Sequence, residues 1–397
     1  MTMPEIQTPP PLPSPSPCNP DPQELTDLKG LTREEIIAFV RSLGEPAFRG
    51  RQIFSWLYRP GIGSFAEMSD ISLAFRERLK ETASISQLTL AAREESRDGA
   101  VKYAFSLADG KQIESVLIPD QERYTLCVSS QVGCAMGCRF CLTGTMGFIR
   151  NLTPAEIVNQ IHFVMEELLR QGQGRLNNLV FMGMGEPLAN LDNLLTALDI
   201  LLDPSGLNFS DRKVTVSTCG LVPKMAELGR RTTVNLAISL HAADDRTRDL
   251  LMPVNATYPL EALLTACRRY PVPKRRRIMM EYVMLKEVND SPAAARRLVK
   301  ILHGIPCKIN LLPYNECPAL PFRSPSRATV EAFQDILLQA GFTVMIRESR
   351  GADISAACGQ LAAQAKADER DAPTNPDASQ DDTSSTTNNR NLLPIHH

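Results

Sequence analysis

The sequence lacks the long apolar segments that a membrane protein needs. Its 397 residues contain no run of about 18 apolar residues, so no membrane-spanning helix is expected. The N-terminus also lacks the basic region followed by an apolar stretch that marks a secretory signal, which predicts a cytoplasmic protein. Ten cysteines in a chain of this length are not the pattern of a small secreted disulfide scaffold. We therefore expect a soluble protein in a reducing compartment.

A strong excess of charge of one sign is also missing. The formal net charge is −2, and the excess of acid comes from the two ends of the chain. Residues 1–24 and residues 365–397 each carry −3, which leaves +4 on the residues between them. This mild basic bias is compatible with an anionic partner but does not identify one.

Three cysteines lie close together in the middle of the sequence. Cys134, Cys138 and Cys141 form a Cys-x3-Cys-x2-Cys array with a glycine before each of the first two. Three thiolates can hold a 4Fe–4S cluster and leave one iron open to another ligand. Structural zinc prefers four ligands, and only His162 follows within thirty residues. The spacing favours an iron–sulfur cluster, with zinc and a disulfide as the alternatives.

Composition and turn signals divide the chain into six segments. Thr32 and Glu35 form a capping box that predicts a helix, and the Asp-Gly pairs at 98–99 and 109–110 predict tight turns between strands. The expected segments are a proline-rich disordered leader (1–24), a helical accessory domain (25–86), a β-meander (87–124), an α/β core (125–348), a short C-terminal segment with one cysteine (349–364) and a polar disordered tail (365–397).

The α/β core shows alternating apolar strands and amphipathic helices, which predicts a parallel sheet closed or part-closed into a barrel. The capping box of Thr153 and Glu156 begins the best-defined helix. The motifs follow strand ends, where such barrels place their chemistry. The expected strands are Thr125–Ser129, Leu179–Met184, Lys213–Ser217, Val234–Leu240, Ile278–Leu285, Lys308–Pro313 and Thr343–Arg347.

Four stretches carry a family resemblance. They are Cys127–Cys134, Met182–Pro187, Ile238–Ala242 and Asp353–Gly359. With the cysteine array, residues 30–364 resemble the radical S-adenosylmethionine (SAM) adenosine C2 methyltransferases of ribosomal and transfer RNA. The resemblance implies an α/β fold: a partial (β/α)6 TIM-like radical-SAM barrel with a small N-terminal RNA-binding helical domain and a β-meander extension.

The resemblance also implies which residues act. Cys134, Cys138 and Cys141 would hold one 4Fe–4S cluster, completed by exchangeable SAM. Cys358 would accept a methyl group from a first SAM, and the radical from a second SAM would activate that group for addition to adenine. Glu114 would remove the proton from carbon 2, and Cys127 would release the product by forming a disulfide with Cys358. The SAM-binding residues would be Gly185, Glu186, Ser217, Ser239, Leu240, His241 and Asn315.

The substrates implied by the resemblance are an adenosine in the peptidyl-transferase centre of 23S rRNA and the adenosine 3′ of the tRNA anticodon. We further expect a monomer that receives electrons from a flavodoxin or ferredoxin. The basic residues at 268–269 and 274–277 are either RNA contacts or a solvated surface. Three other interpretations stay open: the sister antibiotic-resistance class that methylates carbon 8, a non-catalytic iron–sulfur RNA-binding or redox-sensing protein, and a zinc-stabilised fold.

Overall fold

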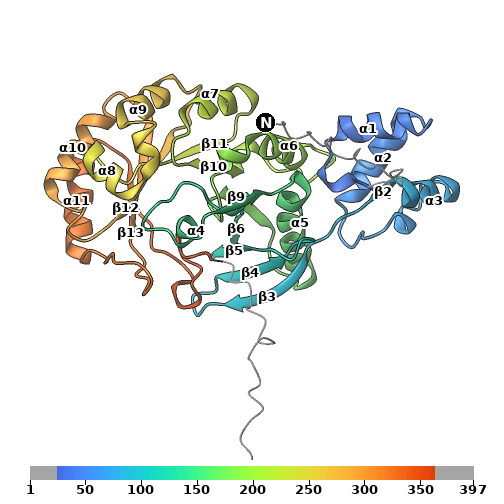
Figure 1. Ribbon diagram of the computed structural model, residues 1–397, viewed down its shortest axis with the longest axis horizontal. Coiled ribbons are helices and arrows are strands. Elements are labelled where there is room, and N and C mark those ends of the chain that lie inside the picture. Colours follow the sequence, from blue (N-terminus) through green and yellow to red (C-terminus); the bar gives the residue numbers. More distant parts are fainter. Residues whose placement is uncertain (1–24, 363–397) are drawn as a thin grey trace, which may run out of the picture. The chain divides into compact units, whose positions relative to one another are not determined.

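The computed structural model describes residues 25–362, so the predicted leader (1–24) and tail (365–397) lie outside the described residues. One ten-stranded sheet runs in the order β14-β13-β12-β11-β10-β9-β6-β5-β4-β3 (Figure 1). Its strands are β3 (Thr89–Glu95), β4 (Val101–Ser106), β5 (Gln112–Asp120), β6 (Arg123–Cys127), β9 (Leu176–Phe181), β10 (Val214–Thr218), β11 (Asn235–Ser239), β12 (Ile278–Met284), β13 (Cys307–Pro313) and β14 (Val344–Ile346). Two small sheets pair β1 (Thr26–Asp27) with β2 (Ala83–Ser84), and β7 (Gln131–Gly133) with β8 (Phe148–Asn151).

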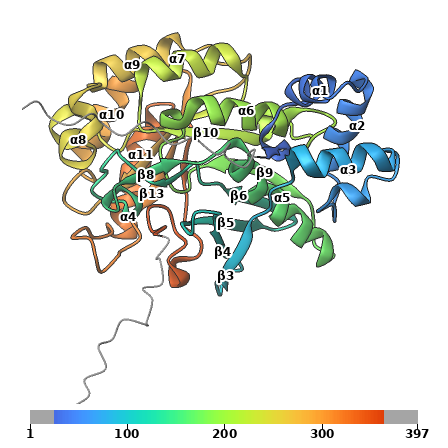
Figure 2. The same cartoon turned by 45° about the vertical axis from the view of Figure 1, so that its right-hand side comes forward.

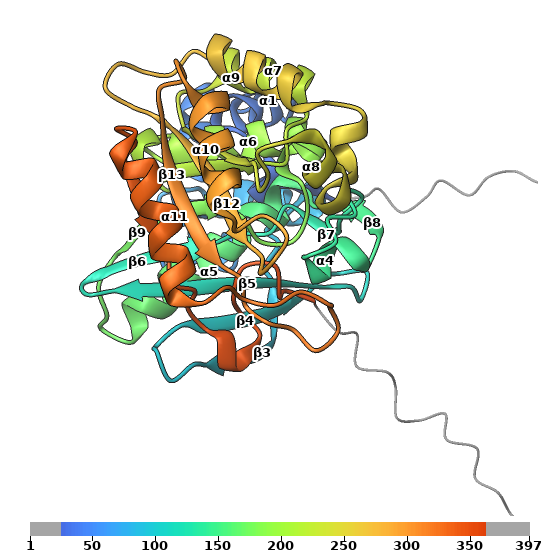
Figure 3. The ribbon, with the colours of Figure 1, turned by 90° about the vertical axis from the view of Figure 1, so that its left-hand side faces the viewer.

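Within the ten-stranded sheet, neighbouring strands pair in parallel from β6 through β9, β10, β11, β12 and β13 to β14. Helices connect them along one face (Figure 3). Parallel pairing requires such crossovers. The fold is therefore the predicted α/β partial barrel, with the short β14 as an added edge strand. Its helices are α4 (Leu142–Thr145), α5 (Pro154–Arg170), α6 (Leu191–Leu202), α7 (Val222–Arg231), α8 (Asp245–Leu251), α9 (Leu260–Arg269), α10 (Pro292–Leu302) and α11 (Arg327–Gln339).

One predicted strand was placed three residues too late. The sequence predicts Leu179–Met184, whereas β9 ends at Phe181. The chain turns there because the Gly183 N–H bonds to the Val128 carbonyl at 3.1 Å. A Cβ at Gly183 would lie 2.7 Å from the Ser129 hydroxyl oxygen, so only glycine permits this close approach to the chain that follows β6.

The antiparallel strands β3, β4 and β5 extend the sheet beyond β6. Both predicted Asp-Gly turns are present. Gly99 and Gly110 have φ values of 84° and 75°, which glycine adopts without steric cost. The extension lies beside the C-terminal segment in Figure 1, because Gly351 N donates to Asp98 at 2.9 Å and Lys102 Nζ donates to the Ile354 carbonyl at 2.7 Å.

The N-terminal helices α1 (Arg33–Ser42), α2 (Ala47–Leu57) and α3 (Leu73–Thr82) form a separate group at one side of the sheet (Figure 2). The capping box of Thr32 and Glu35 begins α1 as expected. The group meets α5 through the buried Lys29, whose Nζ lies 3.3 Å from His162 Nδ1. Of the helices within residues 25–362, none combines the length and the apolar character that a membrane crossing requires.

The arginines of these helices are less free than their positions in the sequence suggest. Arg49 on α2 and Arg76 on α3 are half-buried. They donate to the backbone carbonyls of Asp70 and Ala66 and hold loops together. Their guanidinium groups therefore serve the domain's own structure.

Candidate active site

Glycines shape the loop that carries the cysteine array. Gly133 has φ 73° and ends β7. Cys134 N then donates to the Gly147 carbonyl at 2.8 Å, and Cys141 N donates to the Cys138 carbonyl at 3.1 Å. A Cβ at Gly144 would lie 3.0 Å from Cys138 N, so the loop folds back on itself without room for a side chain there.

The three cysteines line one small cavity of about 190 Å³. Burial raises the pKa of Cys134 to about 11 and raises the pKa of Cys138 and Cys141 as well. Such thiols become good ligands when a positive centre replaces their protons. No three His, Cys, Asp or Glu side chains within residues 25–362 are grouped tightly enough to hold a single metal ion. Three cysteines on one cavity fit a 4Fe–4S cluster, in which each ligand binds a different iron.

The predicted SAM-binding residues gather around the same cavity. Gly185, Glu186, Ser217, Ser239, His241 and Asn315 line it. Leu240 is fully buried and lies behind the lining, where its carbonyl accepts from Arg248 Nε at 3.2 Å. The strand ends after β9, β10, β11 and β13 thus bring together residues that are far apart in the sequence.

Glu186 is the buried acid of this cavity. Its carboxylate oxygens accept from Cys219 N at 2.8 Å and Leu188 N at 3.0 Å. Burial raises its pKa, and these hydrogen bonds to the charged form act in the opposite direction. A carboxylate held in this way suits the ammonium group of an amino acid moiety.

His241 is a neutral, fixed group. Its Nδ1 accepts from Val283 N at 3.0 Å, so the proton of the imidazole resides on Nε2. Burial lowers its pKa to about 3, and Arg248 adds to this effect. Its ring lies edge-on to Phe140, with centroids 4.9 Å apart. His241 can therefore shape and hydrogen-bond a ligand but cannot serve as a cation.

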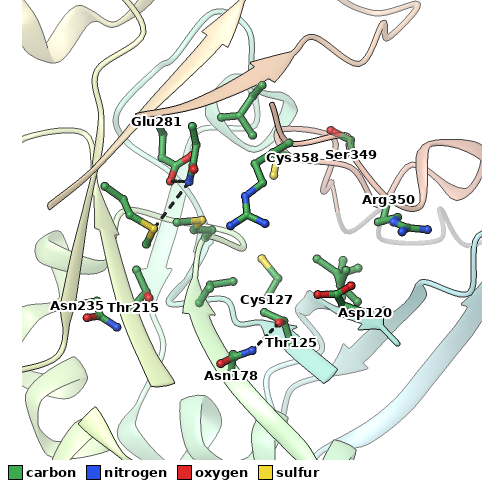
Figure 4. Close-up of a pocket in the computed structure, with 18 of the residues that line it drawn as sticks. Asp120, Thr125, Cys127, Asn178, Thr215, Asn235, Glu281, Ser349, Arg350 and Cys358 are labelled. Carbon is green, nitrogen blue, oxygen red and sulfur yellow. Dashed lines mark hydrogen bonds between the residues drawn. The ribbon is translucent and has the colours of Figure 1, made fainter. Parts of the chain in front are cut away.

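A second, larger cavity of about 1130 Å³ adjoins the first and contains Cys127 and Cys358. Figure 4 shows their sulfur atoms pointing toward one another, from the end of β6 and from the C-terminal segment. Both thiols are free. Cys358 is exposed, whereas Cys127 is buried, and burial raises the pKa of Cys127.

Hydrogen bonds fix the segment that carries Cys358. Leu142 N donates to the Gly359 carbonyl at 2.7 Å, and the Thr143 hydroxyl donates to the Leu361 carbonyl at 2.6 Å. Both donors belong to α4, directly after Cys141. The thiol that the resemblance assigns to methyl transfer is therefore attached to the same short helix as the cysteine array.

Glu114 lies on β5 beneath this segment and is not among the described residues that line either cavity. Its Oε2 accepts from Ala362 N at 2.9 Å, and its Oε1 lies 3.7 Å from Lys102 Nζ. Burial raises its pKa. The predicted base thus holds the end of the Cys358 segment in this conformation.

Known proteins match almost the whole described chain. A dual-specificity RNA methyltransferase RlmN of Desulfotalea psychrophila is 55% identical over 346 residues, covering 86% of this chain and 96% of that protein. Its counterpart in Geobacter sulfurreducens is 54% identical over 337 residues, covering 85% and 92%. The chain belongs to the RlmN family.

The RlmN assignment agrees with two further comparisons. Residues 26–85 match the family described as ribosomal RNA large subunit methyltransferase N-terminal domain, and residues 128–299 match the radical SAM superfamily. A solved radical SAM methyltransferase from Sphaerobacter thermophilus is 42% identical, covers 85% of this chain and all of its own, and has a TM-score of 0.81. The predicted family, fold and enzyme class are confirmed, and radical SAM enzymes use a 4Fe–4S cluster with SAM.

The sequence analysis missed two parts of this RlmN-family site. Glu281 on β12 lines both cavities, and burial raises its pKa to about 7. It accepts from Asn310 Nδ2 at 2.7 Å. Arg248 on α8 is fully buried and donates to the carbonyls of Cys219, Ser239 and Leu240. A charged residue inside an apolar strand was the signal available for Glu281, whereas Arg248 looks like an ordinary exposed helix residue.

Proposed function

We propose that this chain methylates carbon 2 of adenosine in 23S rRNA and in tRNA, at the peptidyl-transferase centre and 3′ of the anticodon. The observation that carries the proposal is that Cys127 and Cys358 face one cavity directly beside the three-thiol pocket. A cluster and SAM at that pocket supply a carbon radical, which an electron-poor ring carbon requires because it cannot attack an electrophilic methyl group.

Each protein group has a distinct part in the proposal. Cys134, Cys138 and Cys141 hold the cluster, and the Glu186 carboxylate receives the amino group of SAM. The sulfur of Cys358 accepts a methyl group and presents it to adenine across the larger cavity. Glu114 takes the proton from carbon 2, which requires it to exchange the Ala362 N–H for the substrate.

Product release follows from thiol chemistry. The Cys127 thiolate attacks the Cys358 sulfur, so a sulfur–sulfur bond forms as the bond from that sulfur to the transferred carbon breaks. The released carbon keeps the electron pair and takes a proton to become the methyl group of the base. The resulting disulfide requires two electrons from a thiol reductant before another cycle. These reducing requirements support the proposal of a cytoplasmic enzyme supplied with electrons by a flavodoxin or ferredoxin. We also propose that the enzyme acts as a monomer.

Mass spectrometry of nucleosides tests the proposal. The full chain is expressed in a host that lacks this methyltransferase, beside a Cys358→Ala variant, and rRNA and tRNA are digested separately. We expect 2-methyladenosine in both RNAs with the wild-type chain only. If 8-methyladenosine appears instead, the proposed regiochemistry is wrong. If neither appears although the cluster is loaded, the proposed activity is wrong.

A further inference from the structure

The larger cavity runs through the lumen of the partial barrel. It begins at Cys358 and Met182, at the carboxyl ends of the strands, and reaches the residues that precede β10, β12 and β13 at the opposite ends. The lumen of a closed (β/α)8 barrel is a packed core. Here side chains such as Asn178, Thr215 and Asn235 surround open space (Figure 4).

The far end of this cavity is strongly basic. We define the barrel mouth by the cations that line the cavity there without an ion pair to any acid in residues 25–362: Arg212, Lys213, Lys274, Arg275, Arg277 and Lys308. They come from different loops, and all but the half-buried Lys308 are exposed. A basic run within one loop is an ordinary surface feature, but here several loops direct cations to one opening.

Acids do not neutralise this mouth. At the mouth, Asp211 is occupied by Arg276, with Arg276 Nη2 2.7 Å from Asp211 Oδ2, and at the other end of the cavity Glu348 is occupied by Arg327 at 2.8 Å. Both of these arginines also line the cavity. The remaining acids along the cavity are Asp120 at the rim and Glu281 deep inside. The mouth therefore retains a net positive field that attracts a polyanion.

The depth of the lumen matches the reach of one nucleotide. Lys308 at the mouth and Leu312 beside the small cavity are four residues apart on β13, or about 13 Å at ~3.3 Å per residue. A base that is modified inside a protein must first leave its stack. Its flanking phosphates then stay outside, where Lys and Arg contacts fix the register of the RNA.

We propose that RNA docks on the barrel mouth and that the target adenosine enters the lumen from there to reach Cys358. This inference rests on the proposed function and specifies where the substrate binds. The mouth contacts the phosphates on both sides of the flipped nucleotide, while the polar lumen receives the base.

A charge-removal experiment tests the mouth. The variant Lys274→Ala/Arg275→Ala/Arg277→Ala is compared with Arg268→Ala/Arg269→Ala/Arg296→Ala, which removes three exposed cations from α9 and α10 that do not line the cavity. Both are prepared as full chains with the cluster loaded, and iron content and circular dichroism establish that they are folded. Fluorescence anisotropy follows binding of an RNA stem-loop with one unpaired adenosine in its loop.

The dependence of affinity on salt is the decisive readout. Each neutralised phosphate on a single strand contributes about 0.7 to the slope of log affinity against log salt concentration. We expect the mouth variant to lose about 2 units of slope, so that its deficit relative to wild type is about 20-fold larger at ~50 mM than at ~200 mM salt. The control variant should keep the wild-type slope. Equal slopes for wild type and mouth variant would overturn the proposal.

Photocrosslinking gives an independent position. A 4-thiouridine beside the loop adenosine should crosslink to peptides that contain Lys213 or residues 274–277. Crosslinks confined to helices α1–α3 would place the RNA elsewhere and contradict the inference. Nucleoside analysis of the wild-type chain separates the two proposals: if it makes 2-methyladenosine while the mouth variant binds normally, only the docking site is wrong.

Discussion

The two ends of the barrel lumen differ in almost every physical property. At the carboxyl ends of the strands, the half-buried cysteines of the array and the buried Glu186 line a small cavity of about 190 Å³. At the opposite ends, exposed lysines and arginines surround an opening. A small cavity that a ligand fills excludes water from reactive intermediates, whereas exposed charge acts over a distance of roughly 8 to 10 Å in salt. The two ends of the barrel lumen thus have different roles: one holds the reactive groups, and the other attracts the RNA.

The same comparison shows how a charge is used at each end. Arg248, at the carboxyl ends of the strands, is fully buried and donates hydrogen bonds to the carbonyls of Cys219, Ser239 and Leu240 at the ends of β10 and β11. Lys274 and Arg277, at the open end, have no acidic partner within residues 25–362. A buried cation without bonded acceptors is costly, so Arg248 organises the site, while the mouth cations stay available to a ligand.

The largest expected effect is the loss of methylation when Cys358, at the carboxyl ends of the strands, is replaced. Cys358→Ala should abolish formation of 2-methyladenosine, because no other thiol occupies its position in the cavity. Its affinity for the RNA stem-loop should stay within about two-fold of wild type, since the side chain lies far from the mouth. Nucleoside mass spectrometry and anisotropy on the same preparation check both halves. A variant that loses binding as strongly as turnover would remove the proposed separation between the two ends.

A smaller loss is expected for Glu114→Gln. Glutamine keeps an oxygen that can accept the Ala362 N–H but cannot take a proton. If Glu114 is the base, the rate of methylation should fall by about 10² to 10⁴, and a covalent protein–RNA species should accumulate on denaturing gels.

Glu114→Ala serves as the comparison, because it removes the contact to Ala362 as well. A Gln variant with normal turnover, beside an inactive Ala variant, would assign Glu114 a positioning role in holding the Cys358 segment. Lys102→Met tests the neighbouring cation, which lies 3.7 Å from the same carboxylate.

The sequence predicted the parts of this molecule that depend on local pattern. Capping boxes at Thr32 and Thr153, the Asp-Gly turns and the strand–helix alternation are all present. The end of β9 was misplaced, because the close approach of Gly183 to Val128 is a tertiary contact. The mouth was missed as a unit for the same reason, since its cations come from separate loops.

The site shows the same limit. Cys134, Cys138 and Cys141 are close in sequence and could be recognised together, and six of the seven residues that motif matching predicts to bind SAM line one cavity. No local signal showed that Glu114 bonds to Ala362, 248 positions away. The proposed roles of Glu114, Cys127 and Cys358 remain predictions.

Glu281 is expected to make the stability of the folded protein depend on pH. Burial raises its pKa from the usual 4.5 to about 7, so the folded protein holds a proton that the unfolded chain releases. Stability should therefore fall as pH rises from about 4.5 to 7 and stay low above that range, by about 3 kcal/mol in total.

Glu281→Gln cannot ionise and should be more stable than wild type above pH 7, with the difference vanishing near about pH 4. Urea unfolding across this pH range measures it. The mouth variant, whose cations are exposed, should show the wild-type pH dependence. A Gln variant that follows the wild-type curve would show that Glu281 is not the titrating group.

The smallest effect is expected for Arg276, which tests what distinguishes a mouth cation from a structural one. Arg276 lines the cavity, yet it pairs with Asp211 at 2.7 Å and donates to the Thr233 carbonyl. Arg276→Gln should cost about 1 kcal/mol of stability or less. Arg277→Gln, at an exposed position without an ion pair in the described chain, should leave the melting temperature unchanged but weaken RNA binding more than Arg276→Gln does. The opposite order would mean that position in the barrel mouth, and not freedom from an acidic partner, selects the cations that meet RNA.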